Sequence, residues 1–290
     1  MTDLRVLRTS KATLQRTFYL DEVGTPATGS VTVSVARLDG TVVDVASATG
    51  PDINNAYSYL FPGSDVLDEL TVTWSGTFGG DAIVFDQDRI EVVGSFYFGL
   101  AEGRASDAAL QNTTRYPTAK LIEARTNTED ECEQITGQAW VPRFCRETLS
   151  GNSLGPLVTT HTMIRAVRAM TVNGVAYAPS AVAALTFSDT GLIYPPGSWG
   201  SVHPGARNVV VEYEHGHDRP VPDIKRGALL RFKSLAMANQ SALSDRAARV
   251  VTVDAAGGST VYASATEDRT GIPETDAAYA RHLSPRPGFG

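Results

Sequence analysis

Alternation of apolar and polar residues over the first third of the chain, from Leu4 to Val93, most constrains the fold, because this stretch has almost no helical periodicity. Its clearest part is a run of valines at every second position: Val31, Val33 and Val35. The dipeptide Asp39-Gly40 separates this run from a second valine-rich run at 42–45. An Asp-Gly pair between two β-branched runs is the strongest short signal for a β-hairpin. We therefore expect antiparallel strands here.

Further apolar runs follow at 57–61, 70–74, 83–85 and 90–93, separated by turns that contain Pro and Gly. About seven short strands at this spacing predict a small antiparallel β-sandwich of the immunoglobulin-like kind. Large aromatic side chains in such strands are more often core than ligand platform. We expect this of Trp74, Phe61 and Phe85.

Charge divides the chain in the same place. The 290 residues hold 25 Lys and Arg against 32 Asp and Glu, a net charge of −7. Residues 1–96 hold 6 Lys and Arg against 13 Asp and Glu, while residues 97–290 hold 19 of each. The whole acidic excess thus belongs to the first third, which predicts a separate accessory domain over 1–96 that repels DNA.

Several protein classes are excluded as leading interpretations. The most apolar stretch, 181–187, has seven residues, one of them Thr186, and is far short of the ~18 that a membrane span needs. The basic N-terminus lacks the hydrophobic stretch of a secretory signal. Two cysteines, Cys132 and Cys145, are too few for a disulfide framework. The hydrophobic content of 42% is typical of a soluble globular protein.

Beyond the sandwich, residues 97–105 are rich in Gly and Ala and predict a linker or a short helix. A helix over about 117–136 begins at Pro117 and stops at Gly137. Its apolar stripe is Leu121, Ala124, Thr128, Cys132 and Ile135. Packing rather than reactivity explains Cys132. Charged residues, Glu129 and Glu133 among them, occupy the other faces.

A β region follows, with a second hairpin turn at Asn173-Gly174. A second main helix spans about 221–246, after Pro220-Val221-Pro222. We thus expect an α+β chain with a core domain at 106–249, two main helices and β-hairpins between them. The C-terminal extension, 250–290, holds a hairpin turning at Gly257-Gly258, a short helix near Pro273 and a Pro/Gly-rich tail.

The second helix is basic: 219–249 hold 7 Lys and Arg against 2 Asp and Glu. This pattern indicates either a solvated basic face or a surface that docks to an acidic neighbour, such as another subunit.

Two short motifs could support chemistry. Asp189-Thr190-Gly191 matches the aspartic protease tripeptide, but that chemistry needs two such carboxylates and the chain has one copy. The same tripeptide is an ordinary turn between strands. His215-Gly216-His217-Asp218 could bind a metal, yet it also suits a strand-to-helix turn, and no third ligand is fixed by spacing. We expect no catalytic residue, metal or cofactor.

The order of segments in the last 180 or so residues is more informative than any one motif. The segments are Arg115-Tyr116-Pro117, Ala139 to Phe144, Val172-Asn173-Gly174, Val209 to Gly216, Val221 to Leu230 and Thr270 to Ala278. This succession resembles the head–tail adaptor (connector) proteins of long-tailed, siphovirus-type bacteriophages, especially those that infect actinobacteria. Gly227 stands where a small Ala is usual. The resemblance does not extend to residues 1–96.

The resemblance implies a structural virion protein and not an enzyme. Such adaptors form a homo-oligomeric ring, commonly of about twelve copies, beneath the portal protein at the head–tail neck. They contact the portal on one side and a stopper or tail protein on the other, and genomic DNA passes through the ring without sequence-specific binding. They assemble in the host cytoplasm and bind no membrane.

By this analogy the C-terminal segment docks to the portal, and the polar faces of the two helices make ring or channel contacts. The docking residues would be Thr270, Ile272, Pro273, Tyr279, Arg281 and Phe289. The ring or channel residues would be Arg219, Lys225, Arg226, Arg231, Lys233, Glu129 and Glu133, with loops near Gly151 and Pro195-Pro196.

The alternative is a β-rich binding protein of a phage or cell surface, which recognises a glycan or host receptor through its N-terminal domain. An exposed aromatic cluster of Tyr57, Tyr59 and Phe61 would favour this alternative. Burial of these rings would count against it.

Overall fold

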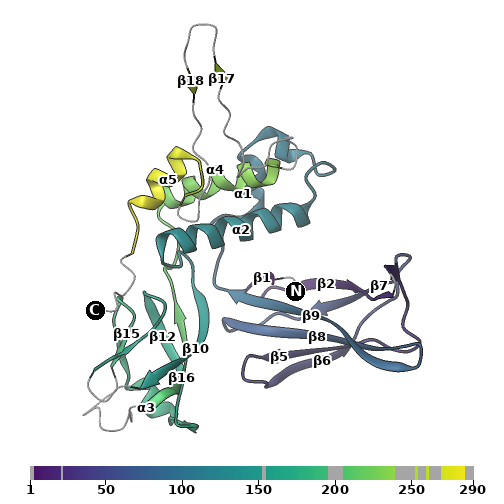
Figure 1. Ribbon diagram of the computed structural model, residues 1–290, viewed down its shortest axis with the longest axis horizontal. Helices are drawn as coiled ribbons and strands as arrows, with labels where there is room; N and C mark the ends of the chain where they lie inside the picture. The colour runs from purple at the N-terminus through teal and green to yellow at the C-terminus, as the bar shows by residue number, and fades with distance from the viewer. Residues whose placement is uncertain are drawn as a thin grey trace.

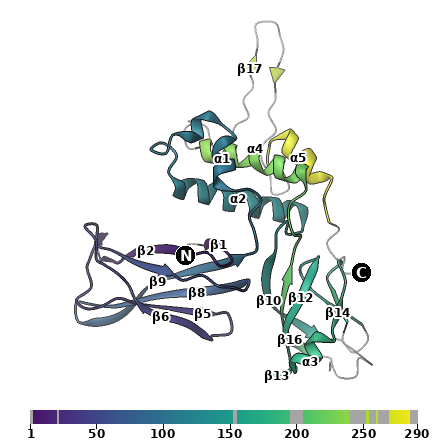
Figure 2. The same ribbon diagram turned by 180° about the vertical axis from the view of Figure 1, so that it is seen from behind.

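A computed structural model describes residues 3–20, 22–151, 155–194, 205–238, 252–253, 259–260 and 269–284. Two β units lie side by side beneath a layer of helices (Figures 1 and 2). The predicted α+β class, with an antiparallel-rich N-terminal β unit and helices later in the chain, is confirmed.

The first β unit is a sandwich whose main sheet has five strands in the order β1-β9-β8-β5-β6. A two-stranded sheet, β2-β7, shares its core, and β3 and β4 form a separate pair. The strands are β1 (Asp3–Leu7), β2 (Ala12–Thr17), β3 (Tyr19–Leu20), β4 (Val23–Gly24), β5 (Thr32–Arg37), β6 (Val42–Ser47), β7 (Ala56–Phe61), β8 (Asp68–Phe78) and β9 (Asp81–Val93). All pairings are antiparallel except that of β1 with β9, which is parallel.

Most of the aromatic residues predicted to form the sandwich core are buried in it. The hairpin between β5 and β6 turns at Gly40, whose φ of 88° suits glycine. Trp74 has no exposed surface, and Phe85 packs against the same core while partly exposed. Tyr57, Tyr59 and Phe61 are 2–4% exposed and so belong to the core as well. This burial counts against the binding-protein alternative in the form predicted above.

The helical layer consists of α1 (Leu100–Ala105), a 3₁₀ turn (Ala108–Gln111), α2 (Thr118–Thr136), α4 (Pro222–Ala238) and α5 (Pro273–Ala280). The predicted stripe of α2 is buried from Leu121 to Cys132, and Gly137 ends the helix with a φ of 72°. Residues 97–105 contain the short helix α1 and are not a free linker, because Tyr97 and Phe98 enter the core of this layer.

The second β unit has a four-stranded sheet in the order β10-β16-β12-β13 and a three-stranded sheet in the order β11-β15-β14, with the short helix α3 (Pro179–Ala183). Its strands are β10 (Arg143–Gly151), β11 (Leu157–Val158), β12 (Ile164–Val172), β13 (Val175–Ala176), β14 (Thr186–Phe187), β15 (Leu192–Tyr194) and β16 (Gly205–His215). The predicted turn joins β12 to β13, with positive φ at Asn173 (51°) and Gly174 (79°).

Other predictions fall at the edges of the described residues. The second main helix is described as far as Ala238. The short strands β17 (Thr252–Val253) and β18 (Ser259–Thr260) pair on either side of the predicted Gly257-Gly258 turn. Phe289 and the Pro195-Pro196 loop lie outside the described residues. None of the described helices is both long and apolar enough to cross a membrane.

Candidate functional site: the charged junction at helix α2

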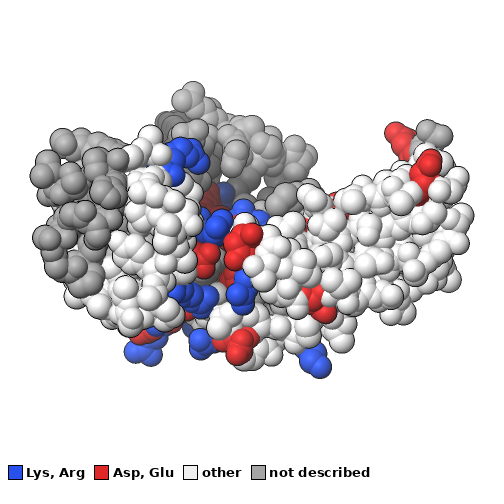
Figure 3. All heavy atoms as spheres, turned by 90° about the horizontal axis from the view of Figure 1, so that it is seen from below, with Lys and Arg blue, Asp and Glu red and all other residues white. Residues whose placement is uncertain are grey.

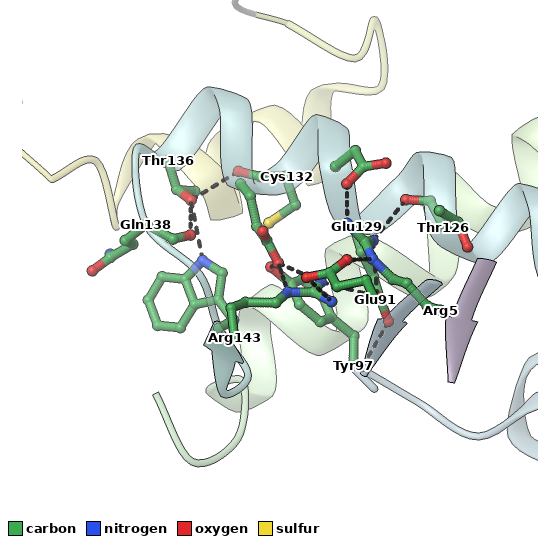
Figure 4. Close-up of polar contacts among 12 residues, drawn as sticks. Arg5, Glu91, Tyr97, Thr126, Glu129, Cys132, Thr136, Gln138 and Arg143 are labelled. Carbon is green, nitrogen blue, oxygen red and sulfur yellow. Dashed lines mark hydrogen bonds and ion pairs between the residues drawn. The ribbon is translucent and has the colours of Figure 1, made fainter. Parts of the chain in front are cut away.

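Charged side chains from four elements meet where α2 passes over the sandwich and β10 (Figure 4). Arg5 comes from β1 and Glu91 from β9, where the two residues are direct partners in the parallel ladder. Glu129 and Glu133 come from α2, and Arg143 is the first residue of β10. Alternation along β1 directs Val6 into the sandwich core and Arg5 to the opposite face, toward α2.

The two guanidinium groups are shared among four carboxylates, of which Asp130 pairs with Arg5 alone. Arg5 Nε lies 2.6 Å from Glu91 Oε2, and Arg5 Nη1 lies 3.3 Å from Glu129 Oε2. Arg143 Nη2 lies 2.7 Å from Glu133 Oε1 and 3.3 Å from Glu129 Oε2, while its Nη1 lies 3.4 Å from Glu91 Oε1. Each arginine therefore bridges the sandwich and α2, and Arg143 extends the bridge to the second β unit.

Hydrogen bonds from Tyr97 complete the cluster. Its backbone N–H donates to Glu129 Oε1 at 2.9 Å, and its hydroxyl donates to Glu133 Oε1 at 3.2 Å. Burial opposes ionisation of Glu91, but Arg143 and Arg5 outweigh it and lower the pKa of that carboxyl. Burial raises the pKa of Glu133, and the same two arginines offset this only in part. The same cluster thus lowers the pKa of Glu91 and raises the pKa of Glu133.

A cleft of about 320 Å³ adjoins the junction between the two β units. Figure 3 shows basic and acidic side chains gathered along the hollow between the units. His161 and His215 line the cleft and stack at 4.0 Å between ring centroids, and burial lowers the pKa of both. Paired opposite charges of this kind position one unit against another.

The predicted basic face of α4 pairs mainly within the chain. Lys225 Nζ lies 2.8 Å from Glu102, Lys233 Nζ lies 2.5 Å from Asp107, and Arg226 Nη2 lies 3.7 Å from Glu274. Arg231 is buried, and its Nε lies 2.6 Å from Glu131. Arg219 is exposed at the strand-to-helix turn. The acidic neighbour expected for this helix is therefore provided by α1, α2, α5 and the turn that follows α1.

Glu129, one of the predicted ring or channel residues on the charged faces of α2, has no exposed surface in the monomer. The side chain of Glu133 is only 21% exposed. The reason is that α2 is covered on one side by α4 and on another by the sandwich and β10, so a helix with a single apolar stripe has two buried faces.

The predicted portal-docking residues divide into two groups. Thr270 and Tyr279 are buried, and Thr270 N and Oγ1 both donate to Asp276 Oδ1 at 2.7 Å, which fixes the start of α5. Pro273 and Arg281 are exposed, whereas Ile272 is half-buried. Thr270 and Tyr279 thus hold α5 onto the helical layer, and Pro273 and Arg281 remain accessible in the monomer.

The two short motifs lie in turns. His215 stacks on His161, whereas His217 stacks on Trp140 at 4.6 Å, so the two histidines have different neighbours. Asp189 lies in the turn between β14 and β15. Among the residues that the structure describes, no three His, Cys, Asp or Glu side chains are grouped to hold a metal ion.

Sequence reasoning missed Arg5, Glu91 and Arg143. Arg5 and Glu91 are 86 positions apart, and Arg5 and Glu129 are 124 positions apart. The parallel pairing of β1 with β9 brings Arg5 beside Glu91, and no local sequence pattern predicts that pairing.

Comparison with known proteins finds a similar solved structure but no related sequence. No known protein family and no curated protein matches the sequence. Among solved structures, the chain is similar to a chain from the neck of an empty GTA particle computed with C6 symmetry. The identity is 16%, the match covers 67% of this chain and 93% of that chain, and the TM-score is 0.42.

Proposed function

We propose that this protein is a head–tail adaptor of a phage-like particle. In this proposal it is a structural and non-enzymatic virion protein, forms a homo-oligomeric ring of about twelve copies beneath the portal protein and contributes to the DNA channel. The ring also contacts a stopper or another neck protein, and it assembles in the host cytoplasm before it enters the virion.

The observation that supports this proposal is the convergence of four of the adaptor-like segments on one core. Tyr116, Trp140, Ile224, Ala228 and Ala278 come from four segments that the sequence separates widely, and all are buried in the same helical cluster. Four of the six segments that resemble an adaptor thus share one core, while Val172 and Val209, from the other two, belong to the core of the second β unit.

The charge distribution is compatible with a channel. Residues 97–290 have equal numbers of basic and acidic residues. Most described cations of α4 are paired with acidic side chains of the same chain. Unpaired cations would bind DNA phosphates and slow the passage of the genome, whereas a neutral wall lets it slide.

The test is the mass of the purified full chain in solution by light scattering, alone and with the portal protein of the same genome. An assembly of about twelve copies, or a monomer that joins a ring only with portal, is expected. Arg226→Glu should weaken assembly, because Arg226 is exposed on the predicted contact face, and Arg8→Glu on the sandwich is the matched control. A monomer that ignores portal would contradict the proposal.

A further inference from the structure

A groove of about 630 Å³ lies at the end of the sandwich that points away from β10 and β16 (Figure 1). The ends of β2, β3, β7 and β9 form it, and the residues that define its chemistry are Gln15, Arg16, Phe18, Tyr19, Phe85 and Asp86. Its volume is within the range of small-molecule binding sites, about 300–1,000 Å³. The junction and the helices play no part in it.

One wall of the groove is aromatic and rigid. The ring of Phe18 stacks on Phe78 at 3.9 Å and meets Phe85 edge-on at 5.8 Å. Phe18 and Phe85 are half-buried, so packing holds both rings in place. Tyr19 stands at the rim with 65% of its surface exposed. Because these rings are already fixed, a ligand can pack against their apolar faces without a further loss of side-chain conformational entropy.

The floor of the groove is a fixed polar cluster. Arg16 Nε lies 2.8 Å from Asp86 Oδ2, and Arg16 also pairs with Asp88, which is buried. Asp88 Oδ2 accepts a hydrogen bond from Trp74 Nε1 at 3.1 Å, and Arg16 Nη1 donates to the Gln15 carbonyl at 2.6 Å. Arg16 is therefore held on every side, while the exposed amide of Gln15 and the half-exposed Asp86 carboxylate can still bond a ligand.

These features select one class of ligand. Since the two carboxylates of Asp86 and Asp88 share the single cation Arg16, this cluster has a surplus of negative charge and disfavours a phosphate or a carboxylate. Flat aromatic faces suit the C–H faces of a sugar ring, and planar amide and carboxylate groups suit adjacent hydroxyls. We propose that this groove binds a neutral glycan. The binding does not depend on the proposed role in the neck, and it uses surfaces other than the buried rings of Tyr57, Tyr59 and Phe61.

The test titrates the purified full chain with four neutral trisaccharides: maltotriose, cellotriose, chitotriose and mannotriose. Saturation-transfer NMR should show saturable binding of at least one, with a Kd on the order of 1 mM, which is usual for an open site. Tyr19→Ala and Gln15→Ala should each weaken binding by about tenfold, or 1.4 kcal/mol. Both side chains are exposed, so neither change disturbs the core, and circular dichroism verifies the fold.

Ile53→Ala is the matched control, because Ile53 is 98% exposed and does not line the groove. It should leave the affinity unchanged. The proposal is overturned if none of the four sugars binds saturably, if Tyr19→Ala binds as tightly as the natural chain, or if Ile53→Ala weakens binding equally. Binding of an oligolysine peptide in place of the sugars would identify a protein-docking surface and would also overturn it.

Discussion

Arg143 is the residue on which the junction depends most. It is 2% exposed and contacts carboxylates of β9 and of α2. Burial by itself opposes its charge, but Glu133, Glu91 and Glu129 outweigh burial and raise its pKa. A buried ion pair gives little net stability against an apolar replacement of both partners, yet loss of one partner leaves an uncompensated charge.

Arg143→Met should therefore reduce the free energy of unfolding by about 3–5 kcal/mol, because three carboxylates lose their shared cation. Urea denaturation measures this. Arg226→Met is the control, since Arg226 and its partner Glu274 are both mostly exposed, and the expected change is within about 0.5 kcal/mol. If both substitutions reduced the free energy of unfolding equally, the buried ion pairs of Arg143 would contribute no more to stability than an exposed pair.

Glu133 and Glu91 should give opposite pH dependences. The raised pKa of Glu133 means that its contribution to stability is lost as pH rises above the ordinary 4.5 and through the folded pKa. The lowered pKa of Glu91 means that its contribution is present above 4.5 and is lost as pH falls through the folded pKa. Relative to the natural chain, Glu133→Gln should thus gain stability as pH rises above 4.5, and Glu91→Gln should lose stability as pH rises toward 4.5 from the acid side.

Urea denaturation on both sides of pH 4.5 measures both differences. If the stability of both variants relative to the natural chain changed with pH in the same direction, the opposite pKa shifts assigned to Glu133 and Glu91 would be contradicted.

Single residues were the least predictable feature of this chain. Burial of Cys132 followed from its place in an apolar stripe. Burial of Glu129 did not, because the second neighbour of α2 is a sheet whose position depends on long-range pairing.

At the scale of elements, the close contact between α4 and α5 is possible because Gly227 has no side chain. A Cβ on Gly227 would lie 3.3 Å from Tyr279 Cε1 and 3.5 Å from both Ala278 Cβ and Thr275 Cα. The two helices therefore approach closely at this point, and the Gly227 carbonyl accepts a hydrogen bond from Thr275 Oγ1 at 3.2 Å. A methyl group is the most that this space can accept.

Gly227→Leu should overpack this contact and destabilise the protein by about 1–3 kcal/mol, with α5 detached first. Limited proteolysis should then cut near α5 sooner than in the natural chain. Arg226→Leu adds the same side chain one position earlier, where the surface is exposed, and should leave the cleavage rate unchanged. Unchanged cleavage in Gly227→Leu would show that α5 can shift to accommodate the larger residue.

Elements were the most predictable feature. Both hairpin turns and the ends of α2 follow from local chemistry, in which glycine at positive φ is the decisive signal. The parallel partner of β9 was not predicted, because strand pairing across the sandwich has no local signature. The aromatic groove was missed for a similar reason, since Phe18 and Phe85 meet only through the fold.

At the scale of the whole molecule, three apolar cores are separate. One belongs to the sandwich, one to the helical layer and one to the second β unit. Arg5, Glu91, Glu129 and Arg143 form ion pairs between them. Since polar junctions join domains less tightly than shared apolar cores, the sandwich should depend on these pairs to unfold together with the rest.

Calorimetry should therefore show one thermal transition for the natural chain and two for Arg5→Met, separated by about 4 °C or more. Arg5 is chosen because its side chain contacts carboxylates of both β9 and α2. Arg89→Met, on the same sheet but 43% exposed, should keep the single transition. A single unchanged transition in Arg5→Met would mean that other contacts couple the units.

The parallel pairing of β1 with β9 also sets a sequence of events during synthesis. Strand β1 is synthesised well before β9 and can find its partner only after Val93 has emerged, so the sheet cannot close its β1 edge early. Arg5 and Glu91 then pair with each other, and Glu129 and Arg143 can join them only after α2 and β10 have been synthesised. The charged junction between the sandwich and α2 can thus form only after Arg143 has been translated, which is later than the strands of the sandwich itself.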